Sequence, residues 1–215
     1  MNTRTEKSKV ASKAYYNLSN RLKDIDQLMQ AHTALTQFQR ARKAAEKAGG
    51  ELTKISEVVD KLVSLPRRGR RHEVDALNRA AIILLCAHLE GYIEDIFSET
   101  AMILLKGSKE EDINWHIKQS LSSFSNPHAD RIDLLFGSIG LVRITNELSW
   151  QKASNRSIKN RLTSYITLRN KLAHGEQERV DKATVIRFMN FVKVFAKKFD
   201  ELINNKIEQF IHHKS

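Results

Sequence analysis

Three features of the amino-acid sequence predict an all-α fold. Apolar residues recur at helical spacing along most of the chain, and no stretch alternates polar and apolar residues as a half-buried strand does. Only two prolines and eight glycines interrupt the 215 residues, too few for the many turns of an all-β protein. We therefore expect a bundle of about four to five core helices, preceded by a helical extension.

The N-terminal extension comprises a long helix and a short one. Residues 8–47 carry a narrow apolar stripe and end at a pair of glycines, which suits packing on a hairpin partner or on a second subunit. The stripe consists of Leu18, Leu22, Ile25 and Met29. Residues 51–65 carry apolar residues on one side and end at Pro66, which cannot continue a helix. We assign residues 1–66 to the extension and residues 73–213 to the main domain.

The main domain begins with the helix that should be its most buried. This helix is expected over residues 73–105, and its centre, 80–87, is apolar on all sides. A short helix around Trp115 follows, then a loop at 124–128 and a short apolar turn at 132–136. The middle of the chain is therefore expected to consist of short elements.

Two further helices complete the expected bundle. The first spans residues 157–173 and ends before Gly175, a residue type that readily takes the left-handed conformation after a helix. Asp181 is the expected N-cap of the last helix. This helix carries a broad apolar stripe that we assign to the core: Val185, Phe188, Met189, Val192, Phe195, Phe199, Leu202, Ile203, Phe210 and Ile211.

The chain is strongly basic, with a formal net charge of +11 and a pI near 9.8. A polyanion such as nucleic acid is a natural partner for this charge, although an acidic partner protein, or no partner, fits it equally well. The cluster of Arg67, Arg68, Arg70 and Arg71 lies in an expected loop. It is a candidate phosphate-binding site, or a solvated connector.

Cysteine content and hydropathy favour the cytoplasm. Cys86 is the single cysteine, which excludes an internal disulfide and favours a reducing compartment. No apolar run is long enough to span a bilayer, and the N-terminus lacks a signal-like apolar core. The eight histidines show no ligand spacing that specifies a metal site, and no glycine-rich loop is present to cradle a phosphate. We therefore expect no metal, no cofactor and no membrane partner.

The residues that point most directly to chemistry are Arg169 and His174. Arginine stays protonated and forks onto phosphate oxygens, whereas histidine exchanges a proton near neutral pH. In a regular helix the two lie about 140° apart with a rise of about 7.5 Å, so they cannot pair on one face. Either the helix loosens at residues 173–175 and swings the imidazole back toward the arginine, or both residues line a groove shared with a second chain. A purely structural alternative is that both stabilise the helix C-terminus as cations.

The segment around these residues resembles a known motif. Residues 169–175, R-N-K-L-A-H-G, resemble the R-x(4–6)-H motif of the HEPN superfamily, in which Asn commonly follows Arg. Residues 83–97 contain L-E-G-Y-I-E-D, which is similar to the signature of the RiboL-PSP-HEPN-like group, and residues 126–140 resemble its connecting segment. The resemblance covers about residues 73–205 and implies a HEPN-like helical bundle.

This resemblance implies a metal-independent endoribonuclease that works as a homodimer with a composite active site. Arg169 would stabilise charge on the phosphate while His174 transfers protons, leaving a 2′,3′-cyclic phosphate. Asn170 and Glu90 would support them, although Glu90 alternatively pairs with Arg169 for packing alone. Lys171 is a weaker candidate for RNA contact. A toxin or antiviral effector, controlled by an antitoxin or an activating partner, is the implied setting.

Two other functions stay open on the sequence. The chain is alternatively a catalytically silent helical module that binds RNA or a partner protein through its N-terminal hairpin. A weaker option is a structural subunit whose cleft senses a nucleotide. RNA cleavage that depends on His174 distinguishes the enzyme from both.

Overall fold

The computed structural model describes residues 11–49, 70–151 and 153–214. These residues contain no strand, and their helices are α1 (Lys13–Ala48), α3 (Arg70–Leu104), α4 (Glu110–Ser122), α5 (Ala129–Gly137), the 3₁₀ helix η1 (Ile144–Glu147), α6 (Asn155–Ala173) and α7 (Lys182–Lys214). The all-α prediction is confirmed. The helix expected over 51–65 lies outside the described residues, as do Arg67 and Arg68. Within the described part, every helix is too polar or too short to serve as a membrane span.

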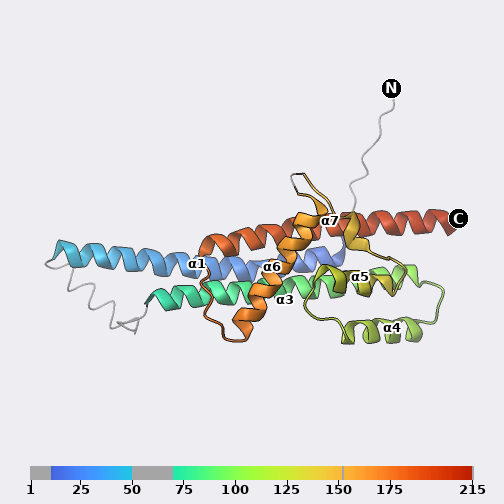
Figure 1. Cartoon of the computed structure of the whole chain (residues 1–215), viewed down its shortest axis with the longest axis horizontal. Helices are drawn as coiled ribbons and strands as arrows, with labels where there is room; N and C mark the ends of the chain where they lie inside the picture. The colour runs from blue at the N-terminus through green and yellow to red at the C-terminus, as the bar shows by residue number, and fades with distance from the viewer. Residues whose placement is uncertain (1–10, 50–69, 152, 215) are drawn as a thin grey trace, which may run out of the picture.

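Three long helices form the body of the molecule. Figure 1 shows α1, α3 and α7 side by side, with α6 crossing them and α4 and α5 next to one end of α3. Helix α1 begins at the N-cap Ser12, whose Oγ accepts the Tyr15 amide at 3.0 Å. Its buried apolar residues beyond the first turn are those of the expected stripe: Leu18, Leu22, Ile25 and Met29. The same chain therefore covers this stripe, with α3 and α7.

Aromatic side chains join α3, α5 and α7 in the core. Phe136 of α5 lies edge-on to Phe97 of α3 and to Phe199 of α7, with ring centroids 5.5 and 5.2 Å apart. The buried hydroxyl of Tyr92 donates to the Ala196 carbonyl at 2.9 Å, which satisfies its only polar atom. These contacts fix α5, and the loop before it, against the two long helices.

Two expectations about the middle of the chain are corrected. Residues 132–136, expected as a turn, belong to helix α5, because Ile132, Leu135 and Phe136 fall on one helical face and are all buried. Helix α3 begins at Arg70, so Arg70 and Arg71 belong to its first turn and not to a loop.

The C-terminal end of α7 does not belong to the core. Phe210 and Ile211, which the apolar stripe assigned to the core, are 37% and 51% exposed. The amide and hydroxyl groups of Ser12 donate to Asp200, which places the start of α1 beside that residue. Helix α7 therefore runs on past the end of its neighbour, as Figure 1 shows. The rest of the expected stripe is buried or packed against the core.

We expect the protein to lose stability as the pH falls below about 6.5, the ordinary pKa of histidine. Burial lowers the pKa of His32 and of His88, although Asp24 lies 3.5 Å from His88 Nε2 and opposes the shift. In this pH window the unfolded chain binds more protons than the folded one, so protonation favours unfolding. The measurement is the urea midpoint at pH 7.5 and at pH 5.5.

The control for this prediction is the double variant His32→Gln/His88→Gln. Its midpoint should change less between the two pH values than that of the wild type. The pKa of Glu94 and that of Glu99 are raised by burial, which acts in the opposite direction and is common to both proteins. Equal pH slopes for the two proteins would contradict the assignment to these histidines.

Candidate active site at the end of helix α6

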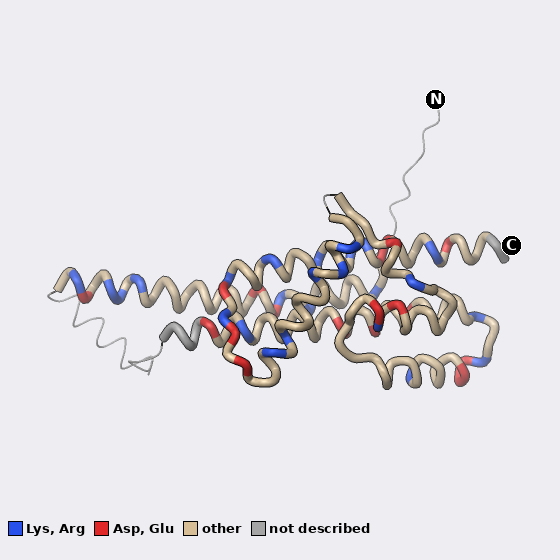
Figure 2. Tube along the Cα trace, in the orientation of Figure 1, with Lys and Arg blue, Asp and Glu red and all other residues tan. Residues whose placement is uncertain are grey.

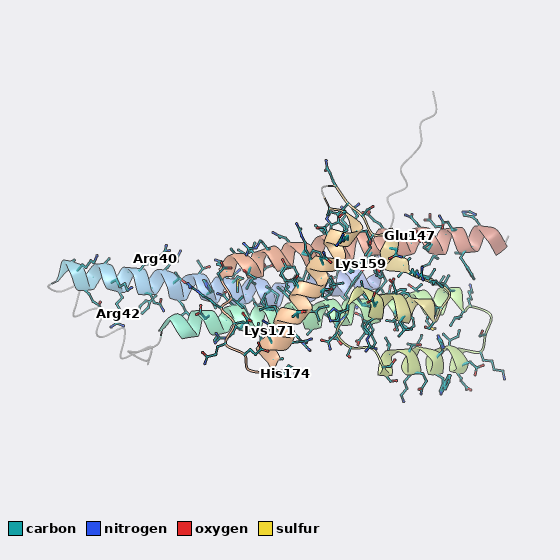
Figure 3. All side chains as sticks on the ribbon, in the orientation of Figure 1. Arg40, Arg42, Glu147, Lys159, Lys171 and His174 are labelled. Atoms are coloured by element: carbon teal, nitrogen blue, oxygen red, sulfur yellow. The ribbon has the colours of Figure 1, made fainter. Side chains whose placement is uncertain are left out.

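The candidate catalytic residues lie at the C-terminal end of α6, where Figure 3 labels Lys171 and His174. The Gly175 amide donates to the Leu172 carbonyl at 3.2 Å, and the Glu176 amide donates to the Lys171 carbonyl at 3.0 Å. Gly175 has φ 82°, the left-handed conformation that the sequence predicts. This pair of bonds is a Schellman motif, which fixes the path of the backbone around His174.

Arg169 turns toward the rest of the domain and is half-buried. Its Nη1 donates to Asn126 Oδ1 at 3.2 Å and to Asn170 Oδ1 at 3.0 Å. Both acceptors are neutral amide oxygens, and in the described residues no carboxylate forms an ion pair with this guanidinium. The arginine is thus oriented without being neutralised, so its positive charge stays available to an anionic ligand.

Asn126 is a contact of Arg169 that the sequence did not point to. It lies in the loop between α4 and α5 and has φ 53°, a conformation that Asn tolerates better than most residues. The loop is held in place by the buried Pro127 and by the His128 amide, which donates to the Asn126 carbonyl at 2.6 Å. The Asn-Pro pair marks the loop in the sequence, but not its contact with Arg169.

His174 does not meet Arg169 within one chain. Its amide donates to the Asn170 carbonyl at 3.0 Å, the bond of a regular α-helix, so the helix stays wound up to His174. The two side chains therefore leave the helix about 140° apart. The backbone leaves the helix only at His174 and Gly175, and this does not place the imidazole in hydrogen-bonding contact with Arg169. The His174 side chain is exposed, and no hydrogen bond joins it to Arg169 in the described residues.

Two residues of helix α3, Glu90 and Cys86, lie near Arg169 of helix α6. Burial raises the pKa of the Cys86 thiol to about 12, against the opposing positive charge of Arg169, so this cysteine is a protonated core residue. Glu90 is half-buried, and its negative charge also raises the pKa of Cys86. Among the described contacts no ion pair joins Glu90 to Arg169, so the pairing considered for packing does not form.

Among the basic residues proposed for RNA contact, Lys171 is close to a carboxylate. Lys171 Nζ lies 2.6 Å from Glu178 Oε1, and this hydrogen bond raises the pKa of Lys171. The loop that carries Glu178 is also held by Asn78, whose Nδ2 donates to the Val180 carbonyl at 2.9 Å. Asp181, the predicted N-cap of α7, accepts the Thr184 amide at 2.7 Å. Lys171 therefore already faces a carboxylate.

The family of this chain follows from comparison with known proteins. The RiboL-PSP-HEPN family model matches residues 50–205, more than half of the chain. This chain belongs to the RiboL-PSP-HEPN family. Comparisons with curated proteins and with solved structures gave no match. The described residues of this HEPN-type protein contain no group of three or more His, Cys, Asp or Glu side chains arranged to hold a metal ion.

The L-E-G-Y-I-E-D segment of this RiboL-PSP-HEPN protein contacts helix α1. A Cβ atom on Gly91 would lie 2.8 Å from Arg21 Nη1, so glycine lets the α1 guanidinium approach the α3 backbone. Four residues later, Asp95 Oδ2 lies 2.9 Å from Arg21 Nη2. Helix α1 precedes the residues that the family model matches, yet it packs directly on the part of α3 that carries the L-E-G-Y-I-E-D segment.

Proposed function

We propose that this protein is a metal-independent endoribonuclease whose active site combines Arg169 of one chain with His174 of a second copy. The observation that carries the proposal is the clamping of Arg169 by two neutral amide oxygens at the end of the helix that His174 caps. A carboxylate partner would neutralise the guanidinium, whereas amide acceptors leave its charge for a phosphate. The net charge of +11 supports a polyanionic substrate.

The proposed reaction needs only a fixed cation and a proton carrier. The RNA 2′-hydroxyl oxygen attacks the adjacent phosphorus, a P–O2′ bond forms and the P–O5′ bond breaks. The 2′-hydroxyl gives up its proton, and the departing O5′ takes up a proton. His174 serves this proton transfer, and Arg169 stabilises charge on the non-bridging oxygens. The products are a 2′,3′-cyclic phosphate and a 5′-hydroxyl.

A second chain can supply the histidine that a single chain does not bring to Arg169. Arg169 and His174 leave α6 about 140° apart, and no hydrogen bond joins their side chains in the described residues, so we assign the histidine of each site to another copy of the chain. In a two-fold dimer, the exposed His174 of one copy is brought to the Arg169 of the other, and symmetry builds the site twice. Figure 2 shows Lys and Arg but no acidic residue along α6, so two such helices present little negative charge to RNA.

The biological setting we propose is that of a toxin or antiviral effector in the cytoplasm. An RNA-cutting enzyme in that compartment requires restraint, which an antitoxin or an activating partner protein would supply. The buried, protonated Cys86 suits a reducing compartment.

The experiment is incubation of the purified full chain with labelled RNA, and with DNA of the same sequence, in the presence of EDTA. We expect cleavage of RNA alone, with cyclic phosphate and 5′-hydroxyl ends, because DNA lacks the attacking 2′-hydroxyl. Cleavage of DNA, or 5′-phosphate ends, would contradict the mechanism. No cleavage by the dimeric protein would favour the alternative, a silent helical module that binds RNA or a protein partner.

Replacing Asn126 with glycine should reduce kcat/KM for RNA about tenfold, because one of two hydrogen bonds to the Arg169 guanidinium is lost. Glycine is chosen because it accepts φ 53° without strain. The matched control is Arg143→Gly, at the other described non-glycine residue with positive φ, 54°. Steady-state kinetics should show a much smaller effect in this control, and equal effects would argue against orientation by Asn126.

A further inference from the structure

A hollow of about 170 Å³ opens between α4 and α5. Phe124 and Leu135 are buried against its inner side, whereas Leu134 stands at its rim and is 68% exposed. A single water needs only about 10–15 Å³ measured in the same way, so the hollow is large enough for an organic group. The remaining lining residues are polar: Ser120, Ser123, Ser138 and Arg131.

Charge distinguishes this hollow from three others on the described surface. It is lined by one cation, Arg131, and by no carboxylate. Each of the other three contains carboxylates beside its cations: Asp75, Glu176 and Glu178 with Arg79 and Arg179 in one, Asp26 with Lys182 in the second, and Asp200 and Glu201 with Lys197 in the third. Carboxylates repel a polyanion, so of these four hollows the one between α4 and α5 is the one suited to RNA.

The loop between α4 and α5 contributes residues both to this hollow and to the candidate active site. Ser123 and Phe124 line the hollow, and Asn126, which follows closely, accepts a hydrogen bond from Arg169. Two residues of chain span at most about 7 Å, so the wall of the hollow and the acceptor of Arg169 are close neighbours. The wall of the hollow and the Arg169 guanidinium are thus connected through one short segment of the α4–α5 loop.

We propose that the α4–α5 hollow binds one nucleoside of the RNA substrate, next to the phosphate held by Arg169. The proposal rests on the ribonuclease function proposed above. The base lies against the apolar side chains of Phe124 and Leu134, a contact that tolerates any base.

The polar groups of the hollow add base preference to this contact. The hydroxyls of Ser123 and Ser138 donate to the carbonyls of Ser120 and Leu135, so their oxygens remain as acceptors for the edge of a base or the ribose hydroxyls. The hydroxyl oxygens of Ser120 and Ser138 lie 3.4 Å apart and are hydrogen-bonded to each other. Arg131 contacts a neighbouring phosphate. The hollow thus sets which base flanks the cleaved bond.

The test compares Leu134→Glu with Val142→Glu in the full-length protein. The two side chains are 68% and 70% exposed, so both variants should fold and both add the same charge. With a labelled RNA oligonucleotide, Leu134→Glu should raise KM about tenfold, leave kcat unchanged and alter the base preference beside the cleaved bond. Val142→Glu should keep the wild-type KM and preference. Identical kinetics and cleavage sites for the two variants would overturn the proposal.

The same experiment separates this proposal from the proposed function. If the wild type cleaves RNA and the two variants do not differ, the hollow is not a nucleoside site but the ribonuclease stands. If the wild type does not cleave, the chain is not a ribonuclease on its own, and binding of the labelled RNA, measured by fluorescence anisotropy, tests the hollow independently of cleavage. Weaker binding by Leu134→Glu than by Val142→Glu supports the hollow, and equal or absent binding overturns it.

Discussion

Replacing His174 with alanine should lower the rate constant of RNA cleavage by about 10²- to 10⁴-fold, the usual contribution of a positioned proton carrier. His174 is exposed and follows the last helical residue of α6, so its side chain contributes no core packing. The variant should therefore fold and unfold within about 0.5 kcal/mol of the wild type. Single-turnover cleavage of a labelled oligonucleotide measures the effect on chemistry directly.

The control for this variant is His212→Ala, which removes another exposed histidine, from the far end of α7. Its cleavage rate should equal that of the wild type. If the two variants cleave RNA equally fast, His174 does not transfer a proton in the rate-limiting step. Its place at the helix end would then reflect the stabilisation of a helix C-terminus by a cation.

Replacing Phe136 with alanine should cost about 3–5 kcal/mol of unfolding free energy. Its ring is fully buried and touches Phe97 and Phe199 edge-on, so the cavity would open where α3, α5 and α7 meet. Urea denaturation followed by circular dichroism measures the loss. The control is Leu134→Ala, on the same helix but 68% exposed, which should change stability by no more than about 0.5 kcal/mol.

A loss at Phe136 comparable to that at Leu134 would contradict the described core. The variant also bears on the active site, because α5 follows the loop that carries Asn126. Where Phe136→Ala remains folded, we expect its RNA cleavage to fall as well, since Arg169 loses a fixed acceptor.

The helices that pack on one face were predictable from the sequence. Ile158, Leu162 and Ile166 recur at intervals of four residues, which leaves one face of α6 to be buried, and all three are buried. The short helix α5 was not predictable as a helix, because nine residues hold too few turns for an apolar period to be distinguished from a turn.

The point at which the long helix α7 leaves the core was not predictable from the sequence either. Phe210 and Ile211 continue the apolar stripe of α7, but a stripe does not say where the neighbouring helix stops. That boundary is set by the contact of Ser12 with Asp200, which joins residues 188 positions apart.

The sequence selected candidate site residues, whose roles stay predictions, but it did not indicate which residues surround them. The spacing of Arg169 and His174 and their resemblance to a known motif identified both residues. The acceptor Asn126 was missed because it lies 43 residues from Arg169, and no local pattern reveals which loop meets the end of α6. The spacing did predict that the two side chains diverge, and the helical hydrogen bond of the His174 amide agrees with it; the second chain that completes the site is our proposal.

The most direct test of the two-chain site is to mix two inactive variants, Arg169→Ala and His174→Ala. After subunit exchange, about half of the dimers contain one chain of each kind, and one of their two sites then combines an intact Arg169 with an intact His174. We expect the mixture to recover about a quarter of the wild-type RNA cleavage, whereas each variant alone stays inactive. A mixture that stays inactive, while native mass spectrometry shows that mixed dimers have formed, would contradict the account.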